Sequence, residues 1–205
     1  MGTGTTSGAN NLPVIVGISG GSGSILARRT IDRLLELRVP VAATCSGGAR
    51  QTWHQEMSDP FKDVLAAWEN SPWFTYYPIG ELGAPIASGT FATHGMIVVP
   101  CSMASLAAIA HGMGSNLLHR AADVCLKEGR KLVLVPRETP LSAIHLENML
   151  TLARLGVTIL SPEPAFYLAP KSIDDVVEFV VERALLAVGV LSQMGGEQTY
   201  TPRTV

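Results

Sequence analysis

The sequence predicts a single three-layer α/β domain in which a doubly wound parallel sheet is covered by helices on both faces. Three observations support this fold. Short runs that are apolar throughout alternate with longer segments of helical period, as expected for parallel strands buried on both faces. The turns between these runs carry glycine and small hydroxyl residues. A chain of 205 residues is also long enough for one sizeable hydrophobic core.

In the first half of the chain, a buried strand is expected at residues 13–18 and is followed by a Ser/Gly cluster and a helix to about Leu37. A second strand at 39–44 leads through the turn at 45–48 into another helix. Residues 57–85 lose any regular period and collect proline and aromatic residues, so only a short helix and an irregular excursion are expected there.

The alternation returns after residue 95. A strand at 96–100 is followed by a helix at 102–111 and by a second helix from about 116 to 127. A further buried strand is expected at 132–135. The segment 96–135 is therefore expected to continue the parallel sheet.

The last part of the chain should add two helices and one strand. Thr139 and Pro140 offer a capping hydroxyl and an N1 proline, so a helix is expected from there to about Arg154. A strand is expected at 157–160. The final helix should begin at Ser172, with Asp175 three residues on, and continue to about Val190.

Composition narrows the function classes. Only 16% of the residues are charged, against roughly 25% in an average soluble domain, which favours burial of further surface in a homo-oligomer. A net charge of −2 provides no general field for nucleic acid or an anionic membrane. No apolar run approaches the roughly 20 residues of a membrane helix, and the start of the chain does not resemble a secretion signal. We therefore expect a cytoplasmic protein.

The cysteines argue against a disulfide framework and against a structural metal site. Cys45, Cys101 and Cys125 are odd in number and widely spaced, with no C-x-x-C pair. Reduced, mostly buried thiols are expected, and no metal is called for.

Glycine and hydroxyl residues follow the first strand at residues 17–24, where backbone N–H groups and a helix N-terminus could hold a phosphate. Alone, this turn is equally compatible with a purely structural role, because it fits neither the P-loop nor the dinucleotide pattern. Similar turns follow the next two strands, at 45–48 and 100–105. Ligands bind at the carboxyl ends of such strands, so the three turns together suggest an extended ligand with a phosphate, such as a mononucleotide.

Charged residues near later strands offer further candidates. Arg137 and Glu138 leave a buried strand together, and could bind a phosphate and transfer a proton, or form an ordinary loop ion pair. Arg120 and Lys127 share a helix face with Asp123, which is more often a solvated stripe. Tyr167 could offer its hydroxyl to the same anion, or could simply be a core or interface tyrosine.

The final helix provides a more specific clue. At 100° per residue, Arg183 falls on a stripe with Val176, Val180 and Ala187, inside the apolar arc. A buried guanidinium is expensive without a partner, so Arg183 is expected to meet an anion from elsewhere. An ion pair across a subunit contact is the alternative.

Several longer motifs resemble UbiX-type flavin prenyltransferases over residues 13–190. These motifs are Ala87-Ser88-Gly89-Thr90, Pro100-Cys101-Ser102, the segment 116–128, the segment 133–145 (VLVPRETPLSAIH) and Pro164-Ala165-Phe166-Tyr167. The resemblance implies a Rossmann-like flavoprotein domain at 13–191, a flexible N-terminal segment at 1–12 and a C-terminal tail at 192–205. The chain departs from the family pattern at Gly23, where an aromatic residue is common.

The resemblance also implies a set of binding residues and no metal. Dimethylallyl phosphate would lie against the flavin, in a pocket completed by neighbouring subunits of a homo-oligomer, commonly a dodecamer. The residues implied to surround FMN are Gly17, Ile18, Ser19, Ser46, Ser102, Met103, Ala104, Ser105 and Arg137. The residues implied at the donor are Ser88, Gly89, Arg120, Lys127, Tyr167 and Arg183.

The activity implied is transfer of a dimethylallyl group to reduced FMN, which yields prenylated FMN for a UbiD-type decarboxylase. Ser19 and Glu138 would relay protons for closure of the new ring. Two alternatives remain: an FMN-dependent cysteine-type decarboxylase on the same fold, and a non-catalytic flavin carrier subunit of a decarboxylase. The first would require a histidine before His54, which is absent. The second would have no use for a second anion site.

Overall fold

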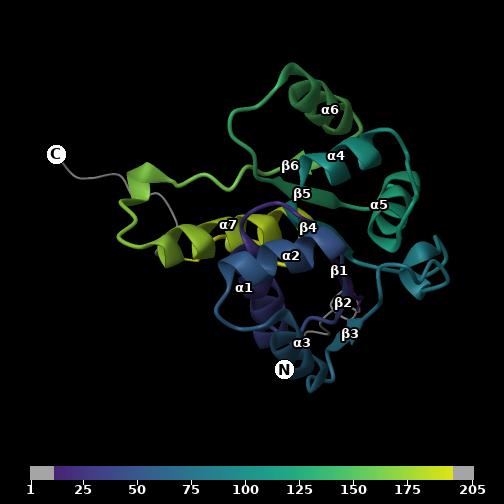
Figure 1. Cartoon of the computed structure of the whole chain (residues 1–205), viewed down its shortest axis with the longest axis horizontal. Helices are drawn as coiled ribbons and strands as arrows, with labels where there is room; N and C mark the ends of the chain where they lie inside the picture. Colours follow the sequence, from purple (N-terminus) through teal and green to yellow (C-terminus); the bar gives the residue numbers. More distant parts are fainter. Residues whose placement is uncertain (1–11, 196–205) are drawn as a thin grey trace, which may run out of the picture.

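In the computed structural model, which describes residues 12–195, one six-stranded parallel sheet is sandwiched between two layers of helices (Figure 1). The prediction of a doubly wound α/β domain is confirmed. The strands are β1 Val14–Ile18, β2 Val41–Cys45, β3 Phe74–Tyr76, β4 Gly95–Cys101, β5 Leu132–Pro136 and β6 Thr158–Ile159. The α-helices are α1 Ser24–Glu36, α2 Gly47–Glu56, α3 Phe61–Glu69, α4 Met103–Ala110, α5 Leu117–Lys127, α6 Ala143–Arg154 and α7 Ile173–Val188, with short 3-10 turns η2 Pro85–Ala87 and η3 Phe166–Leu168.

The strand order is β3-β2-β1-β4-β5-β6. The chain therefore winds outward in one direction from β1 and then in the other from β4. Ligands of such sheets bind in the crevice at the carboxyl ends of the strands where the order reverses. The turns that follow β1 and β4, which the sequence singled out, lie at this point.

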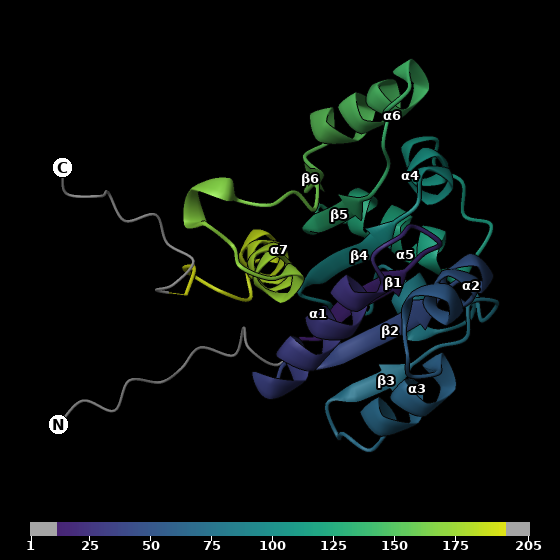
Figure 2. The ribbon, with the colours of Figure 1, turned by 60° about the vertical axis from the view of Figure 1, so that its left-hand side comes forward.

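The two faces of the sheet have separate cores because successive side chains of a strand point to opposite sides. Val14 and Val16 pack with α1, α2, α3 and α7, whereas Ile15 packs with α4, α5 and α6. Both faces are buried, which explains why each strand is apolar throughout. Figure 2 shows the two helical layers on either side of the strands.

The excursion between residues 57 and 85 contains a strand that was not predicted. β3 adds to the outer edge of β2, and aromatic residues hold α2 and α3 over it. Trp53 packs edge-on against Phe61 at 5.2 Å and against Trp68 at 6.1 Å between ring centroids. These contacts join residues of two different helices, so the period within one segment does not predict them.

The expected helix start at Thr139 and Pro140 is wrong. Helix α6 begins at Ala143, where the Ser142 side chain accepts from the backbone N–H of His145 and the His145 ring accepts from the backbone N–H of Ser142. This capping box satisfies the free N–H groups of the first turn, so the helix begins there instead of at the proline. The predicted ends of the last helix are confirmed: Ser172 caps α7 with Asp175, and Gly189 ends it with φ 92°.

The cysteines are free and buried, as expected. Burial raises the pKa of Cys45 and Cys101 to about 12 and that of Cys125 to about 11. Residues 12–195 contain no helix that is both apolar and long enough to cross a membrane. Within the same range, no cluster of three or more potential metal ligands occurs. The expected N-terminal segment and C-terminal tail lie largely outside the described residues.

Candidate active site

Four serines meet at the carboxyl ends of β1, β2 and β4, and we call Ser19, Ser46, Ser102 and Ser105 the hydroxyl rim. The Ser19 hydroxyl donates to the carbonyl of Pro100 at 3.1 Å and accepts from the backbone N–H of Ser102 at 2.7 Å. Its own backbone N–H also donates to Pro100, at 3.2 Å. Ser19 thus joins the turn after β1 to the turn after β4 across the switch point of the sheet.

The other rim serines begin helices. Ser102 accepts from the backbone N–H of Ser105 at 3.2 Å, and Ser46 accepts from that of Ala49 at 3.1 Å. Ser102 also donates to the Ser105 hydroxyl at 3.2 Å. Capping and a ligand contact are compatible roles, because both use groups at the start of a helix. Met103 and Ala104 form the first turn of α4 beside them.

Glycines allow the turns of the rim to approach one another. A Cβ on Gly20 would lie 3.1 Å from the backbone of Gly48, and one on Gly21 would lie 3.3 Å from the backbone of Cys101. Any larger residue would push these turns apart. The close approach of three turns leaves a backbone-lined edge of the kind that a flat ring system or a phosphate can reach.

Gly17 and Ile18 have core positions. A Cβ on Gly17 would lie 2.9 Å from Met96 Cε and 3.0 Å from Leu118, so the missing side chain lets α5 pack on the sheet. The Ile18 side chain is 2% exposed and belongs to the core on the opposite face. Any contact of these two residues with FMN must therefore come from the backbone. Their role in FMN binding stays a prediction.

Glu56 is a residue of this region that the sequence did not reveal. Its carboxylate accepts from the backbone N–H of Ser24 at 2.7 Å and from that of Gly23 at 3.0 Å. Burial raises the pKa of Glu56, but hydrogen bonds from Ser22, Ser24 and Gly23 outweigh it, so the pKa lies below its usual value. The start of α1, where a phosphate was expected, already binds a carboxylate of the same chain.

The conformation of Gly23 explains the departure from the family pattern. Gly23 has φ 114°, a left-handed backbone that side chains rarely adopt, and precedes the first residue of α1. It contributes no side-chain cap, and Glu56 from the end of α2 takes that place. Glu56 lies 33 positions from Gly23 in the sequence, so a local motif around Gly23 could not predict this contact.

His119 is a second residue near the hydroxyl rim that the sequence analysis did not predict. Its Nε2 lies 3.4 Å from the Ser105 hydroxyl, and its Nδ1 lies 3.2 Å from the hydroxyl of Ser115. Burial lowers the pKa of the His119 imidazole. The ring ties α5 to the first turn of α4 and so supports Ser105.

Arg137 and Glu138 follow β5 and are exposed. Glu138 accepts from the backbone N–H of Thr139 at 3.0 Å. Both side chains line an open hollow of about 450 Å³ together with Met149 and Ser161. A solvent-open position leaves these side chains available to a ligand, and no ion pair between the two appears among the described residues. The ordinary loop ion pair is therefore not formed here.

Four of the residues expected at the donor lie on α5 or against it, and we call Ser88, Gly89, Arg120 and Lys127 the α5 cluster. Arg120 lies near the start of the helix and Lys127 at its end. A Cβ on Gly89 would lie 2.6 Å from Lys127 Nζ, so the ammonium rests over the Gly89 backbone. Lys127 also pairs with Glu128. Arg120 donates to the carbonyl of Ala87 at 3.2 Å and pairs with Asp123 at 2.7 Å.

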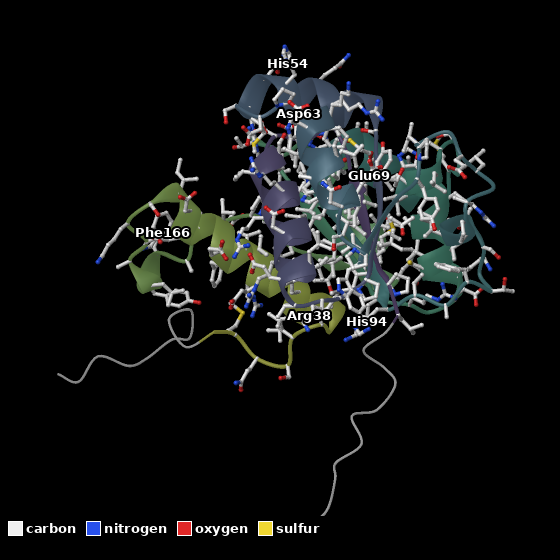
Figure 3. The ribbon with its side chains drawn as sticks, turned by 90° about the horizontal axis from the view of Figure 1, so that it is seen from below. Arg38, His54, Asp63, Glu69, His94 and Phe166 are labelled. Atoms are coloured by element: carbon white, nitrogen blue, oxygen red, sulfur yellow. The ribbon has the colours of Figure 1, made fainter. Side chains whose placement is uncertain are left out.

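Lys127 lies at the opposite edge of the sheet from the hydroxyl rim of the same chain, so the expectation of one shared rim does not hold for this residue within a single chain. Lys127 ends α5, and residues 128–131 connect it directly to the start of β5. Since the strands are parallel, the start of β5 lies at the edge opposite to the hydroxyl rim. Strands of five residues separate the two edges by about 17 Å. In Figure 3, His94, which precedes β4, and Arg38, which precedes β2, lie together at this amino-terminal edge.

The interpretation of Arg183 must also be corrected. The buried residues of α7 are centred on Val181, Ala184 and Val188, and Arg183 lies roughly 130° from the middle of that arc at 100° per residue. Its side chain is exposed in the single chain. Val176 and Ala187 are only partly buried, so the stripe read from the sequence lies along the margin of the buried arc.

Tyr167 lies on a projecting segment, residues 161–172, that we call the arm. Phe166 is 80% exposed and Tyr167 is 61% exposed. Figures 1 and 2 show the arm and α5 on opposite sides of the molecule, and Figure 3 shows Phe166 well away from the sheet. Tyr167 therefore cannot meet Lys127 within one chain.

Comparisons with known proteins cover most of the chain. A family model described as "Flavoprotein" matches residues 4–185. The flavin prenyltransferase UbiX of Synechocystis sp. is 45% identical over 183 residues, which are 84% of this chain and 89% of that protein.

Solved structures give the same picture. The dodecameric FMN-dependent Ubix-like decarboxylase from Escherichia coli O157:H7 has a TM-score of 0.81 and 46% identity, and covers 87% of this chain and 94% of its own. AnUbiX in complex with FMN and dimethylallyl pyrophosphate has a TM-score of 0.85 and 37% identity, and covers 95% of this chain and 100% of its own. Peptidyl-cysteine decarboxylase EpiD, at 19% identity and a TM-score of 0.55, shares the fold alone.

Proposed function

This chain belongs to the flavoprotein family and, within it, to the UbiX-type flavin prenyltransferases, and we propose that it transfers a dimethylallyl group to reduced FMN. The product is prenylated FMN. The relative solved with FMN and dimethylallyl pyrophosphate supports this assignment. The observation that carries it in this chain is the hydroxyl rim, which joins two sheet turns at the switch point through one buried serine.

The chemistry of the rim fits FMN. Small residues and helix N-termini present hydroxyl and N–H groups to a phosphate, which is favoured at such positions. The glycine contacts between turns leave no side chains between the ligand and the backbone. We assign FMN binding to Ser19, Ser46, Ser102 and Ser105, with Met103, Ala104 and Arg137 beside them and Gly17 and Ile18 contributing backbone.

The donor site is proposed to form only between chains. Lys127 lies at the opposite edge of the sheet from the rim of its own chain, Tyr167 lies on the projecting arm, and the exposed Arg183 lies on α7. A homo-oligomer can place the rim of one subunit against the α5 cluster and arm of others. The Escherichia coli O157:H7 relative is dodecameric, and we propose the same assembly here.

In this arrangement each residue has a defined task. Lys127, Arg120, Arg183 and Tyr167 would stabilise charge that develops on the phosphate leaving group. Ser88 and Gly89 would border the donor. Ser19 and Glu138 would move protons during ring closure, and the surrounding subunits would exclude water from a reactive allylic group. Bound FMN supplies the nucleophile.

The product would be passed to a UbiD-type decarboxylase. Prenylated FMN is a cofactor without a reaction at the site that makes it, so a second enzyme must use it. We propose that this exchange takes place in the cytoplasm. The homology to prenyltransferases and the two cations of the α5 cluster, Arg120 and Lys127, favour catalysis over a passive flavin carrier.

The direct test is to mix the purified protein anaerobically with reduced FMN and dimethylallyl phosphate and to weigh the released flavin. A flavin heavier by one five-carbon unit is expected. Dimethylallyl pyrophosphate serves as the alternative donor in a parallel reaction. Unchanged FMN with both donors, from protein that binds FMN, would refute the proposed function and leave the carrier role.

A further inference from the structure

We propose that Arg130 is a positioning residue for the prenyl donor, because it fixes the segment 87–93 so that Ser88 and Gly89 stay beside Lys127. This inference rests on the proposed function, in which the α5 cluster meets the donor. Arg130 itself touches neither ligand in this arrangement. It acts through the backbone of the segment that it holds.

The guanidinium of Arg130 makes three contacts with this segment. It donates to the carbonyl of Gly89 at 2.5 Å, to the carbonyl of Phe91 at 2.9 Å and to the Thr93 hydroxyl at 3.3 Å. The three acceptors belong to alternate residues of one short stretch of chain. Hydrogen bonds from a charged donor are stronger than those from a neutral one, so the conformation of this stretch depends on Arg130.

The end of α5 directs Arg130 to its position. Gly129, with φ 64°, turns the backbone at the C-terminus of the helix, and the N–H of Arg130 donates back to the carbonyl of Cys125 at 2.8 Å. The turn sends the Arg130 side chain toward residues 89–93, while Lys127 lies over Gly89. Arg130 thus binds the carbonyl of Gly89, while the Lys127 ammonium and the Glu128 carboxylate occupy the space that a side chain at Gly89 would need.

A second guanidinium holds the other end of the segment. Arg120 donates to the carbonyl of Ala87 at 3.2 Å and is itself oriented by Asp123. Arg120 therefore fixes the segment at Ala87 and Arg130 fixes it from Gly89 to Thr93. Ser88 lies between these two sets of hydrogen bonds. Ser88 also contacts the Thr90 hydroxyl at 2.9 Å. Both contacts described for the Ser88 hydroxyl are with Thr90, within this held stretch.

A lysine cannot replace Arg130 at all three acceptors. The guanidinium is a rigid planar fork with five N–H donors, whereas an ammonium is a point charge on a flexible stem. A lysine at position 130 should hold one carbonyl and release the others. The shape of the segment, and with it the position of Gly89 beneath Lys127, should then be partly lost.

The structure also predicts which ligand is affected. The residues that Arg130 holds, 89–93, lead to the start of β4 at the amino-terminal edge of the sheet, whereas the hydroxyl rim lies at the carboxyl edge. Loss of the Arg130 contacts should weaken donor binding and spare FMN. A merely structural role would lower both together through a loss of folded protein.

The test compares Arg130→Met and Arg130→Lys with Arg38→Met, a change at an exposed arginine before β2. Prenylation is measured anaerobically in the assembled protein, and FMN affinity is measured separately. In Arg130→Met we expect the KM for dimethylallyl phosphate to rise about tenfold or more, with FMN affinity within about twofold. Arg130→Lys should fall between Arg130→Met and the native protein, and Arg38→Met should match the native protein.

Hydrogen exchange provides a readout that does not depend on activity. Backbone amides of residues 88–93 should exchange faster in Arg130→Met, while those around Ser19 and Ser102 keep their native rate. A donor KM within about twofold of native in Arg130→Met, or an equal loss of donor and FMN binding, would overturn the inference. If Arg130→Met does not assemble, Arg130→Lys carries the same comparison. Absence of prenylated FMN from the native protein would instead refute the proposed function, and hydrogen exchange would still decide whether Arg130 holds the segment.

Discussion

The hydroxyl rim and the α5 cluster differ in how complete each is within one chain. At the rim, Ser19 is 1% exposed and is bonded to both Pro100 and Ser102, so the turns are fixed before any ligand arrives. At the α5 cluster, Lys127 is exposed and is paired with Glu128. A phosphate would have to compete with this carboxylate for the Lys127 ammonium. Under the proposed function, we therefore expect FMN binding to be a property of the folded subunit and donor binding to require the assembly.

This difference has a physical basis. The rim is built from backbone groups and short side chains, which lose little conformational freedom when they are ordered. The α5 cluster and Arg183 use long cationic side chains that stay hydrated until an anion and a second surface remove water from them. A site that gathers its cations only between subunits avoids burying like charges in the monomer.

The strongest test of this difference uses two variants, each of which lacks one cation of the proposed donor site. Lys127→Ala and Arg183→Ala should each lose at least about 10²-fold in turnover, because each removes a cation from the leaving group. When the two are unfolded, mixed and reassembled, about a quarter of the sites should regain both residues if these come from different chains. Turnover is followed as prenylated FMN formed under anaerobic conditions.

The control for this experiment is a mixture in which each variant is reassembled with itself. No recovery in the true mixture, despite mixed oligomers seen by native mass spectrometry, would mean that one chain supplies both cations. FMN affinity should remain nearly native in either variant. A parallel loss of FMN affinity in Arg183→Ala would make that residue structural.

Glu138→Gln sharpens the division between binding and chemistry. The carboxamide keeps the size of the side chain and cannot take up a proton, so FMN should bind while ring closure slows by about 10²-fold or more. Stopped reactions should then contain a singly attached prenyl group that has not closed the new ring. The two species are isomers of equal mass, so the absorption spectrum of the flavin distinguishes them, whereas mass spectrometry confirms only that the prenyl group is attached. Full activity would remove Glu138 from the mechanism.

Ser19→Ala tests the pre-formed rim itself. The change leaves the N–H of Ser102 without its acceptor at 2.7 Å, and an unsatisfied buried donor costs about 1–3 kcal/mol. Affinity for FMN should fall by about tenfold, as measured by fluorescence titration. Ser88→Ala, at an exposed position of the α5 cluster, is the matched change and should leave FMN affinity unaltered. Equal effects of both would contradict the separation of the two sites.

Glu56→Gln should have the smallest effect. The folded-state pKa of Glu56 lies below its usual value of 4.5, so the carboxylate stabilises the fold above that pH and its contribution is lost as the pH falls through the folded pKa. Because the side chain is partly exposed, the loss at neutral pH should be about 1 kcal/mol or less. Urea unfolding at pH 7 and pH 4 should show a narrower gap between the native protein and Glu56→Gln at pH 4. A gap that widens toward pH 4 would contradict this assignment.

The sequence alone determined the fold class, the family and the capping of the last helix. The residues that cap the last helix lie within it or next to it: Ser172, Asp175 and Gly189. A strand buried on both faces can be recognised from five consecutive residues, because all of them are apolar or small. It also located all three turns of the rim, because glycine and serine after a strand are a local signal. Such features need no knowledge of where distant parts of the chain lie.

Only the tertiary structure decided which of these residues meet. It placed Glu56 on the turn at Gly23, put β3 beneath an aromatic cluster and brought Arg130 to Gly89, all through contacts between residues far apart in sequence. It also separated Lys127 from Ser19 by the length of the strands and turned Arg183 away from the core. A helical period reports which side of a helix is apolar, but only the packing of that helix determines which part of the apolar side is buried.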